Sequence, residues 1–210
     1  MSEKLKLERR VYEFEVRAEQ GENGKTIVGR PIVYDRMTDI GPYEEVIVNG
    51  ALTMADLTDV RFLVNHNTKS IPLARSRRNN GNSTMQLTVD EQGMLINVNL
   101  DVDNNSEARA LYSAVMRGDI SGMSFMFSVR RDEWVNIDSE HPTRRILEIA
   151  SVVEVSAVTF PAYTDTDIQA RNAETLENAK RALENAKRQS LESDKNEIEL
   201  LKQKISILGG

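Results

Sequence analysis

The chain has 210 residues, of which 40% are hydrophobic and 29% are charged, and this composition fits one compact domain with an appendage. The net charge of -6 argues against a general nucleic-acid binder, because phosphate recognition needs an excess of positive charge on one face. No apolar run approaches the roughly 18 residues that cross a bilayer, and the chain starts with charged residues, so we expect no membrane span, no secretory signal and a cytosolic protein.

Short runs rich in Val, Ile, Leu, Phe and Thr, separated by turn residues, make up most of residues 12–165. This pattern predicts mainly β structure, arranged as a barrel or a sandwich. Two turns, at 21–24 and 90–93, place Gly where a hairpin needs a positive φ. Strands are expected at 12–18, 26–34, 43–47, 60–65, 85–90, 93–101, 122–134 and 145–159.

Two stretches of the body have helical rather than strand periodicity. Residues 105–117 place apolar side chains on one face, follow good capping residues at 104–106 and stop at Gly118, so they predict a helix of about three turns. A weaker apolar stripe after 49–51 predicts a second, shorter helix.

The residue pattern changes from strand-like to helix-like after Pro161. Residues 172–204 contain no Gly or Pro, and the heptad at 176–182 is repeated almost unchanged at 183–189, which predicts a long separate helix. Its apolar seam slips by one residue, so both a coiled coil with a second copy and a solitary charged helix fit the pattern. The expected organisation is a flexible N-terminus at 1–11, a body at 12–165 and a helical tail at 166–210.

Few residue types are present that could carry catalysis. The chain has no Cys, which excludes disulfides, thiolate zinc sites and a Cys nucleophile, and with only two His we expect neither a metal nor a cofactor. The remaining nucleophilic arrangement is a hydroxyl activated by His66, which stands at the end of the strand expected at 60–65. A His that merely caps that strand by hydrogen bonding is the alternative reading.

Ser124 is the candidate hydroxyl. Alternation along the strand places Met123, Phe125 and Phe127 on the core face and turns Ser124 out of the core on a rigid element, which suits a nucleophile. An ordinary polar residue on a solvated face is the alternative. Ser121 precedes the strand and fits a turn residue.

Glu154 stands within an otherwise apolar strand, where a carboxylate is costly unless something pairs with it. A protonated His66 would be such a partner. Glu148 has the same strand parity, so either carboxylate could orient the base, and Glu154 is the more deeply embedded. A carboxylate on the solvated face of an edge strand remains the alternative.

An ordered set of motifs resembles the prohead maturation proteases of tailed phages of the HK97 type. The resemblance covers about residues 12–165. The segments that carry it are Phe-Leu-Val-Asn-His-Asn at 62–67, Gly-Asp-Ile-Ser-Gly-Met-Ser-Phe-Met-Phe at 118–127, the run from Leu147 to Ala162, and Gly-Arg-Pro-Ile-Val-Tyr at 29–34.

The resemblance implies a serine endopeptidase with a fold like that of herpesvirus assembly proteases, a closed or partly closed β-barrel flanked by helices. It matches His66 with the general base and Ser124 with the nucleophile, whereas Glu154 is assigned as the third member from its expected burial. Such enzymes act inside the immature prohead in the host cytoplasm, where they cleave the scaffolding segment of the major capsid protein and also cut themselves. The C-terminal helix then becomes a targeting or oligomerisation tail.

Other readings remain open on the sequence. A non-enzymatic capsid-assembly or scaffold protein, with a β-domain and a coiled-coil tail, explains the tail equally well. His141 could supply a second His to the triad, although it lies in a turn between strands. Arg75 could contact an oxyanion or the substrate, or belong to a solvated basic loop.

Overall fold

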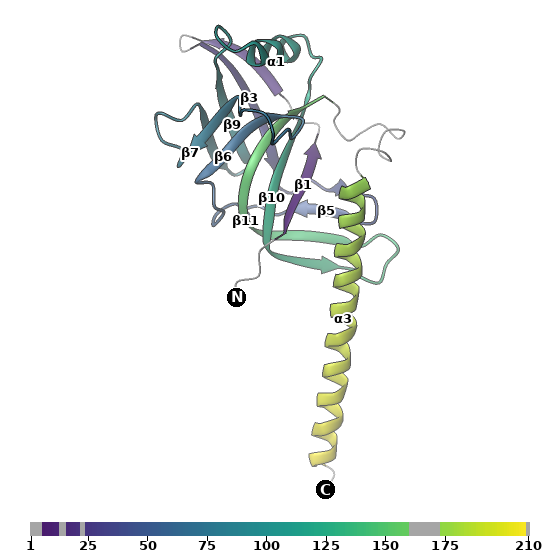
Figure 1. The fold of residues 1–210 in the computed structure, drawn as a ribbon. Helices are drawn as coiled ribbons and strands as arrows, with labels where there is room; N and C mark the ends of the chain where they lie inside the picture. The colour runs from purple at the N-terminus through teal and green to yellow at the C-terminus, as the bar shows by residue number, and fades with distance from the viewer. Residues whose placement is uncertain (1–5, 13–15, 22–23, 160–172, 209–210) are drawn as a thin grey trace.

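The computed structural model describes residues 6–12, 16–21, 24–159 and 173–208, and its strands form two sheets (Figure 1). The four-stranded sheet, in the order β2-β3-β9-β8, contains β2 (Val16–Gly21), β3 (Gly24–Val33), β8 (Met85–Asp90) and β9 (Gly93–Leu100). The seven-stranded sheet contains β1 (Leu7–Tyr12), β4 (Thr38–Asp39), β5 (Glu44–Ile47), β6 (Asp59–Val64), β7 (Ala74–Arg77), β10 (Gly122–Val135) and β11 (Thr143–Val158).

The long strand β11 organises the larger sheet. It pairs antiparallel with β10 along its length, parallel with β5 near its start and parallel with β6 near its end. The sheet therefore branches at β11. One path runs β1-β10-β11-β5-β4. A second path begins where β6 pairs with the end of β11, and it continues to β7. Within the described residues neither sheet closes on itself, so the mainly β class is confirmed and the expected barrel is not.

Most expected strands are present, and three expectations about the chain need correction. Residues 7–11, expected to be flexible, belong to β1, which pairs antiparallel with β10. The short helix expected after 49–51 is a series of turns. The expected strand at 12–18 is two separate strands in different sheets, and residues 13–15 between them lie outside the described residues, as do residues 22–23 of the first expected hairpin.

The hydrophobic core draws side chains from both sheets into one cluster. Met123, Phe125 and Phe127 alternate along β10 and are completely buried, as strand periodicity predicts. The helix expected at 105–117 is confirmed as α1 (Ser106–Met116), and the Asn105 side chain caps it by accepting from two backbone N–H groups. Its buried face packs against β2, β3 and β9.

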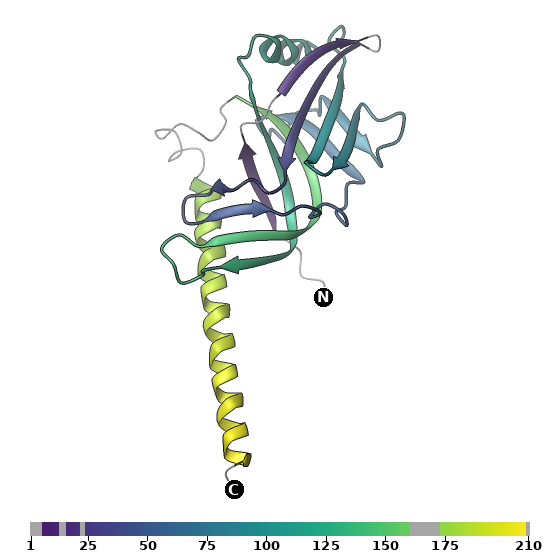
Figure 2. The same ribbon diagram turned by 180° about the vertical axis from the view of Figure 1, so that it is seen from behind.

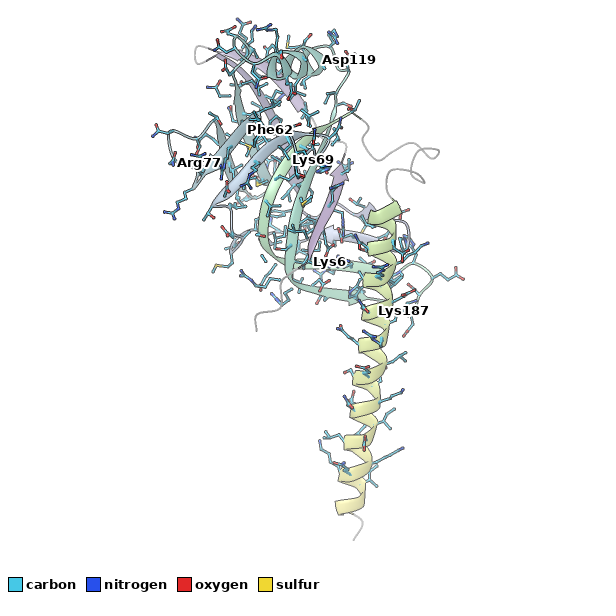
Figure 3. The ribbon with its side chains drawn as sticks, in the orientation of Figure 1. Lys6, Phe62, Lys69, Arg77, Asp119 and Lys187 are labelled. Atoms are coloured by element: carbon cyan, nitrogen blue, oxygen red, sulfur yellow. The ribbon has the colours of Figure 1, made fainter. Side chains whose placement is uncertain are left out.

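The long helix expected over 172–204 is confirmed as α3 (Ala173–Leu208). Its first turns pack beside β1: the Ala179 side chain is buried, and Lys6 Nζ donates a 2.8 Å hydrogen bond to Asn178 Oδ1. Figures 1 and 2 show the rest of α3 extending away from the sheets, and in Figure 3 Lys6 lies at the end of the body beside the helix that carries Lys187.

A buried cluster of charges joins β1 to the rest of the larger sheet. Arg10 Nε lies 2.5 Å from Glu45 Oε1, and Arg144 contacts Glu8, Glu45 and Asp132 at 2.6–3.2 Å. Burial by itself raises the pKa of Glu8, but Arg10 and Arg144 outweigh burial and lower this pKa to about 2. These ion pairs explain why a strongly charged segment, Leu7–Tyr12, forms an ordered strand.

Replacing Glu45 by Gln should strongly destabilise the fold. Glu45 is completely buried, and its loss leaves two buried guanidinium groups short of a counter-charge, which typically costs about 3 to 5 kcal/mol. Chemical denaturation measures this loss. Glu133→Gln is the matched control: Glu133 pairs with Arg145 on the exposed surface, so the change should stay within about 0.5 kcal/mol. Equal effects of the two substitutions would contradict the prediction.

Candidate active site

His66 is positioned by a left-handed turn that follows β6. Asn65 and His66 have φ of 51° and 56°, a region that Asn tolerates better than most residues. Asn65 is held in it by its backbone N–H, which donates to Ala157 O at 2.9 Å, and by its side chain, which bonds Thr159. The turn leaves the imidazole only 8% exposed.

Glu154 contacts this imidazole directly. Its Oε1 lies 2.5 Å from His66 Nδ1, and its Oε2 accepts a 2.6 Å hydrogen bond from the Ser156 hydroxyl. The carboxylate is 3% exposed, and these two partners offset the cost of burying it. A carboxylate accepts, so in this pair Nδ1 carries the proton and Nε2 is left as the basic nitrogen.

Ser124 lies on β10, between β1 and β11. It pairs across the strands with Ser156, and because directly opposite residues share a face, it lies on the same face of the sheet as Ser156 and Glu154. The face that alternation predicts is therefore correct, but the side chain is completely buried rather than solvated. Its hydroxyl donates a 2.6 Å hydrogen bond to the carbonyl of Arg10 on β1.

Ser124 and Glu154 thus lie on the adjacent strands β10 and β11, and His66 lies in the turn after β6, which pairs with β11 on its other side. His66 and Glu154 are in contact, and the Ser124 hydroxyl is turned toward β1. Among the described residues, the buried His66 Nε2 has no hydrogen-bond partner. The imidazole therefore keeps an unused acceptor, and β11 lies between the strand before His66 and the strand that carries Ser124.

The alternative residues are engaged elsewhere. Glu148 bonds Arg131 at 2.9 Å, and irregularities in the β10–β11 register separate it from the part of the strand that carries Glu154. His141 lies 3.6 Å from Asp39 and is 41% exposed, and Arg75 makes two hydrogen bonds to Asp59.

A largely apolar cavity of about 450 Å³ lies beside the His66 turn. Residues just before and after His66 line it, and α1 forms part of its wall. In Figure 3, Lys69 marks the loop that follows this turn. The lining residues are Leu63, Val64, Asn65, Asn67, Ser70, Ile71, Leu73, Glu107, Ala110, Leu111, Ala114 and Ile120.

In the part of the chain that the structure describes, no three His, Asp or Glu side chains are grouped so as to hold a metal ion. Of the described helices, none is both long and apolar enough to span a membrane.

Ser156 is the residue of this cluster that sequence reasoning missed. It stands two positions after Glu154 on a strand and therefore shares its face, so parity alone could have indicated it. Its contact with the backbone of His66 could not be read from the sequence, because it depends on the pairing of β11 with β6.

Residues 12–182 match the family described as caudovirus prohead serine protease. The prohead protease of Enterobacteria phage HK97 is 31% identical over 130 residues, which are 60% of this chain and 52% of that protein, so the chain matches about half the length of this relative. The bacteriophage T4 capsid assembly protease aligns with a TM-score of 0.45 and 10% identity, covering 76% of this chain and 100% of that structure.

Proposed function

From the membership of this chain in the caudovirus prohead serine protease family, we propose that it is a serine endopeptidase in which His66, Ser124 and Glu154 form the catalytic triad. The observation that carries this proposal is the 2.5 Å contact between His66 Nδ1 and Glu154 Oε1 on the sheet face that also bears Ser124. A carboxylate that holds Nδ1–H orients the imidazole and stabilises it once it is protonated.

The reaction is acyl transfer to the Ser124 hydroxyl. His66 Nε2 takes the proton as Ser124 Oγ attacks a peptide carbonyl, and it then gives the proton to the leaving amine. Water, deprotonated by His66, next attacks the acyl group on Ser124, and its release as a carboxylic acid returns the proton to Ser124 Oγ. Backbone N–H groups near Ser124 would stabilise the oxyanion. The attack requires the completely buried Ser124 hydroxyl to leave the Arg10 carbonyl and to become accessible both to Nε2 and to the substrate.

The proposed substrates are the scaffolding segment of the major capsid protein and the protease itself. The proposed site of action is the immature prohead, assembled in the host cytoplasm. The apolar cavity beside the His66 turn is suited to an aliphatic side chain of the substrate, because its walls are largely Leu, Ile, Val and Ala.

Co-expression with the cognate capsid protein tests this function. We expect the full chain to shorten the capsid protein, and purified protein to shorten itself, in both cases depending on Ser124. Mass spectrometry of the products measures both cleavages and locates the sites. Normal assembly without any shortening would favour instead a non-enzymatic scaffold protein.

We further propose that α3 pairs with a second copy of the chain. Beyond the part that contacts the body, Leu191, Ile198, Leu201 and Ile205 follow heptad spacing at 49–69% exposure, and the exposed Leu200 lies off this seam. Replacing Ile198 and Leu201 together by Glu should convert an oligomer to a monomer in analytical ultracentrifugation. Replacing Glu197 and Glu199 by Gln is the control and should leave the oligomer intact. A wild-type monomer at high concentration would refute the pairing.

A further inference from the structure

Ser156 makes two hydrogen bonds, one to each member of the His66–Glu154 pair. Its hydroxyl donates to Glu154 Oε2 at 2.6 Å, and its oxygen accepts from the backbone N–H of His66 at 3.2 Å. The residue is completely buried on β11, opposite Ser124 on one side and opposite Leu63 of β6 on the other.

The direction of both bonds follows from the chemistry of the groups. A hydroxyl has one proton and two lone pairs, a carboxylate only accepts and a backbone N–H only donates. Ser156 therefore donates to Glu154 and accepts from His66, and a methyl group in its place could do neither. Other small side chains of β11, such as Ala157, fill space without offering these bonds.

We infer that Ser156 is a positioning residue, which holds Glu154 and His66 in the mutual geometry that the reaction needs. This inference rests on the proposed function. The bond to Oε2 fixes the rotation of the carboxylate, so that Oε1 faces Nδ1. The bond from the His66 N–H anchors the left-handed turn that carries the imidazole, where φ is 56°.

Without the hydroxyl, two polar groups lose their partners at once. The carboxylate of Glu154 is then free to rotate, and the backbone N–H of His66 loses its hydrogen bond to the Ser156 hydroxyl. A displacement of about 1 Å at a catalytic group lowers the rate by about 10²-fold, and loss of a supporting hydrogen bond by about 10- to 100-fold. The defect should appear in kcat rather than KM, because Ser156 is completely buried and its two hydrogen bonds go to Glu154 and to the His66 backbone.

The matched pair Ser156→Thr and Ser156→Val tests the inference. The two side chains have the same shape and differ only in the hydroxyl, so any crowding in the buried site affects both. We expect Ser156→Val to cleave the capsid protein with a kcat about 10- to 100-fold below that of Ser156→Thr, at KM values within about twofold. Ser156→Ala should show the same defect relative to the unaltered protein.

A spectroscopic readout separates this role from the proposed function. In full-length protein carrying Ser124→Ala, which should not cut itself, the Nδ1–H of His66 should give a downfield proton resonance. The chain has only two His, and His141→Gln assigns the signal. Ser156→Thr should retain this resonance, whereas Ser156→Val should shift or broaden it.

The outcomes are distinct. Equal kcat and an unchanged resonance in Ser156→Thr and Ser156→Val would overturn the inference. Failure of both Ser156→Val and Ser156→Ala to fold, with Ser156→Thr folded, would also overturn it, because the hydroxyl would then serve stability. Undiminished cleavage by Ser124→Ala would refute the proposed function alone, since the resonance still reports on the His66–Glu154 pair.

Discussion

Replacing Ser124 by Ala is expected to lower capsid-protein cleavage and self-cleavage by about 10⁴- to 10⁶-fold, because removing the nucleophile leaves only binding and oxyanion stabilisation. The fold should tolerate the change. Ala fits the buried site on β10, and loss of the hydrogen bond to the Arg10 carbonyl costs about 1 kcal/mol of unfolding free energy. Cleavage is measured by mass spectrometry, and the unfolding free energy by denaturation.

Ser128→Ala is the matched control for this prediction. Ser128 lies four residues further along β10, is also buried, and exchanges a 2.8 Å hydrogen bond with Ser151 rather than with the candidate site. Its replacement should cost similar stability and leave cleavage unchanged. Cleavage by Ser124→Ala at more than a hundredth of the normal rate, or an equal loss in Ser128→Ala, would exclude Ser124 as the nucleophile.

Replacing Glu154 by Gln should lower the cleavage rate by about 10⁴-fold by changing the His66 tautomer. The Ser156 hydroxyl favours the amide oxygen of Gln on its own side, which turns the amide NH₂ toward Nδ1. Nδ1 must then accept, so the imidazole proton moves to Nε2. A protonated Nε2 cannot take the proton of Ser124.

Glu148→Gln controls for the loss of a carboxylate from the same strand. Glu148 is partly exposed and pairs with Arg131, so its replacement should change the cleavage rate by less than about twofold. Steady-state cleavage of a capsid-protein peptide compares the two variants. If Glu154→Gln keeps a tenth of the normal rate, the carboxylate does not orient the base.

The candidate site illustrates what residue patterns predict and what they do not. The scarcity of Cys and His indicated His66, and an isolated carboxylate in an apolar strand indicated Glu154. Strand parity left Ser124 as either a nucleophile or an ordinary polar residue, and the resemblance to prohead proteases matched it with the nucleophile. Strand alternation alone places Glu148 and Glu154 on the same face, so it does not show which carboxylate faces His66. The difference between them arises from register irregularities in β10 and β11, which turn one carboxylate to Arg131 and the other to His66.

In the fold, too, local residue patterns predicted the elements, whereas contacts between distant segments decided how they pair. Alternating apolar residues predicted most of the strands, and the Gly-free repeats predicted α3, because both patterns depend on local periodicity. Local periodicity does not indicate which strands pair with each other. The membership of Leu7–Tyr12 in the larger sheet depends on buried ion pairs with residues 35 to 136 positions away, and the branching at β11 depends on two parallel neighbours.

The amino-acid sequence by itself determined the mainly β class, the capped helix α1, the helical tail and the identity of the candidate catalytic groups. Tertiary structure alone decided that the sheets stay open over the residues described, that Ser124 is buried against the Arg10 carbonyl, and that Ser156 joins Glu154 to His66. The physical reason is that side-chain chemistry and strand parity are local properties, whereas register and burial arise from contacts between segments distant along the chain.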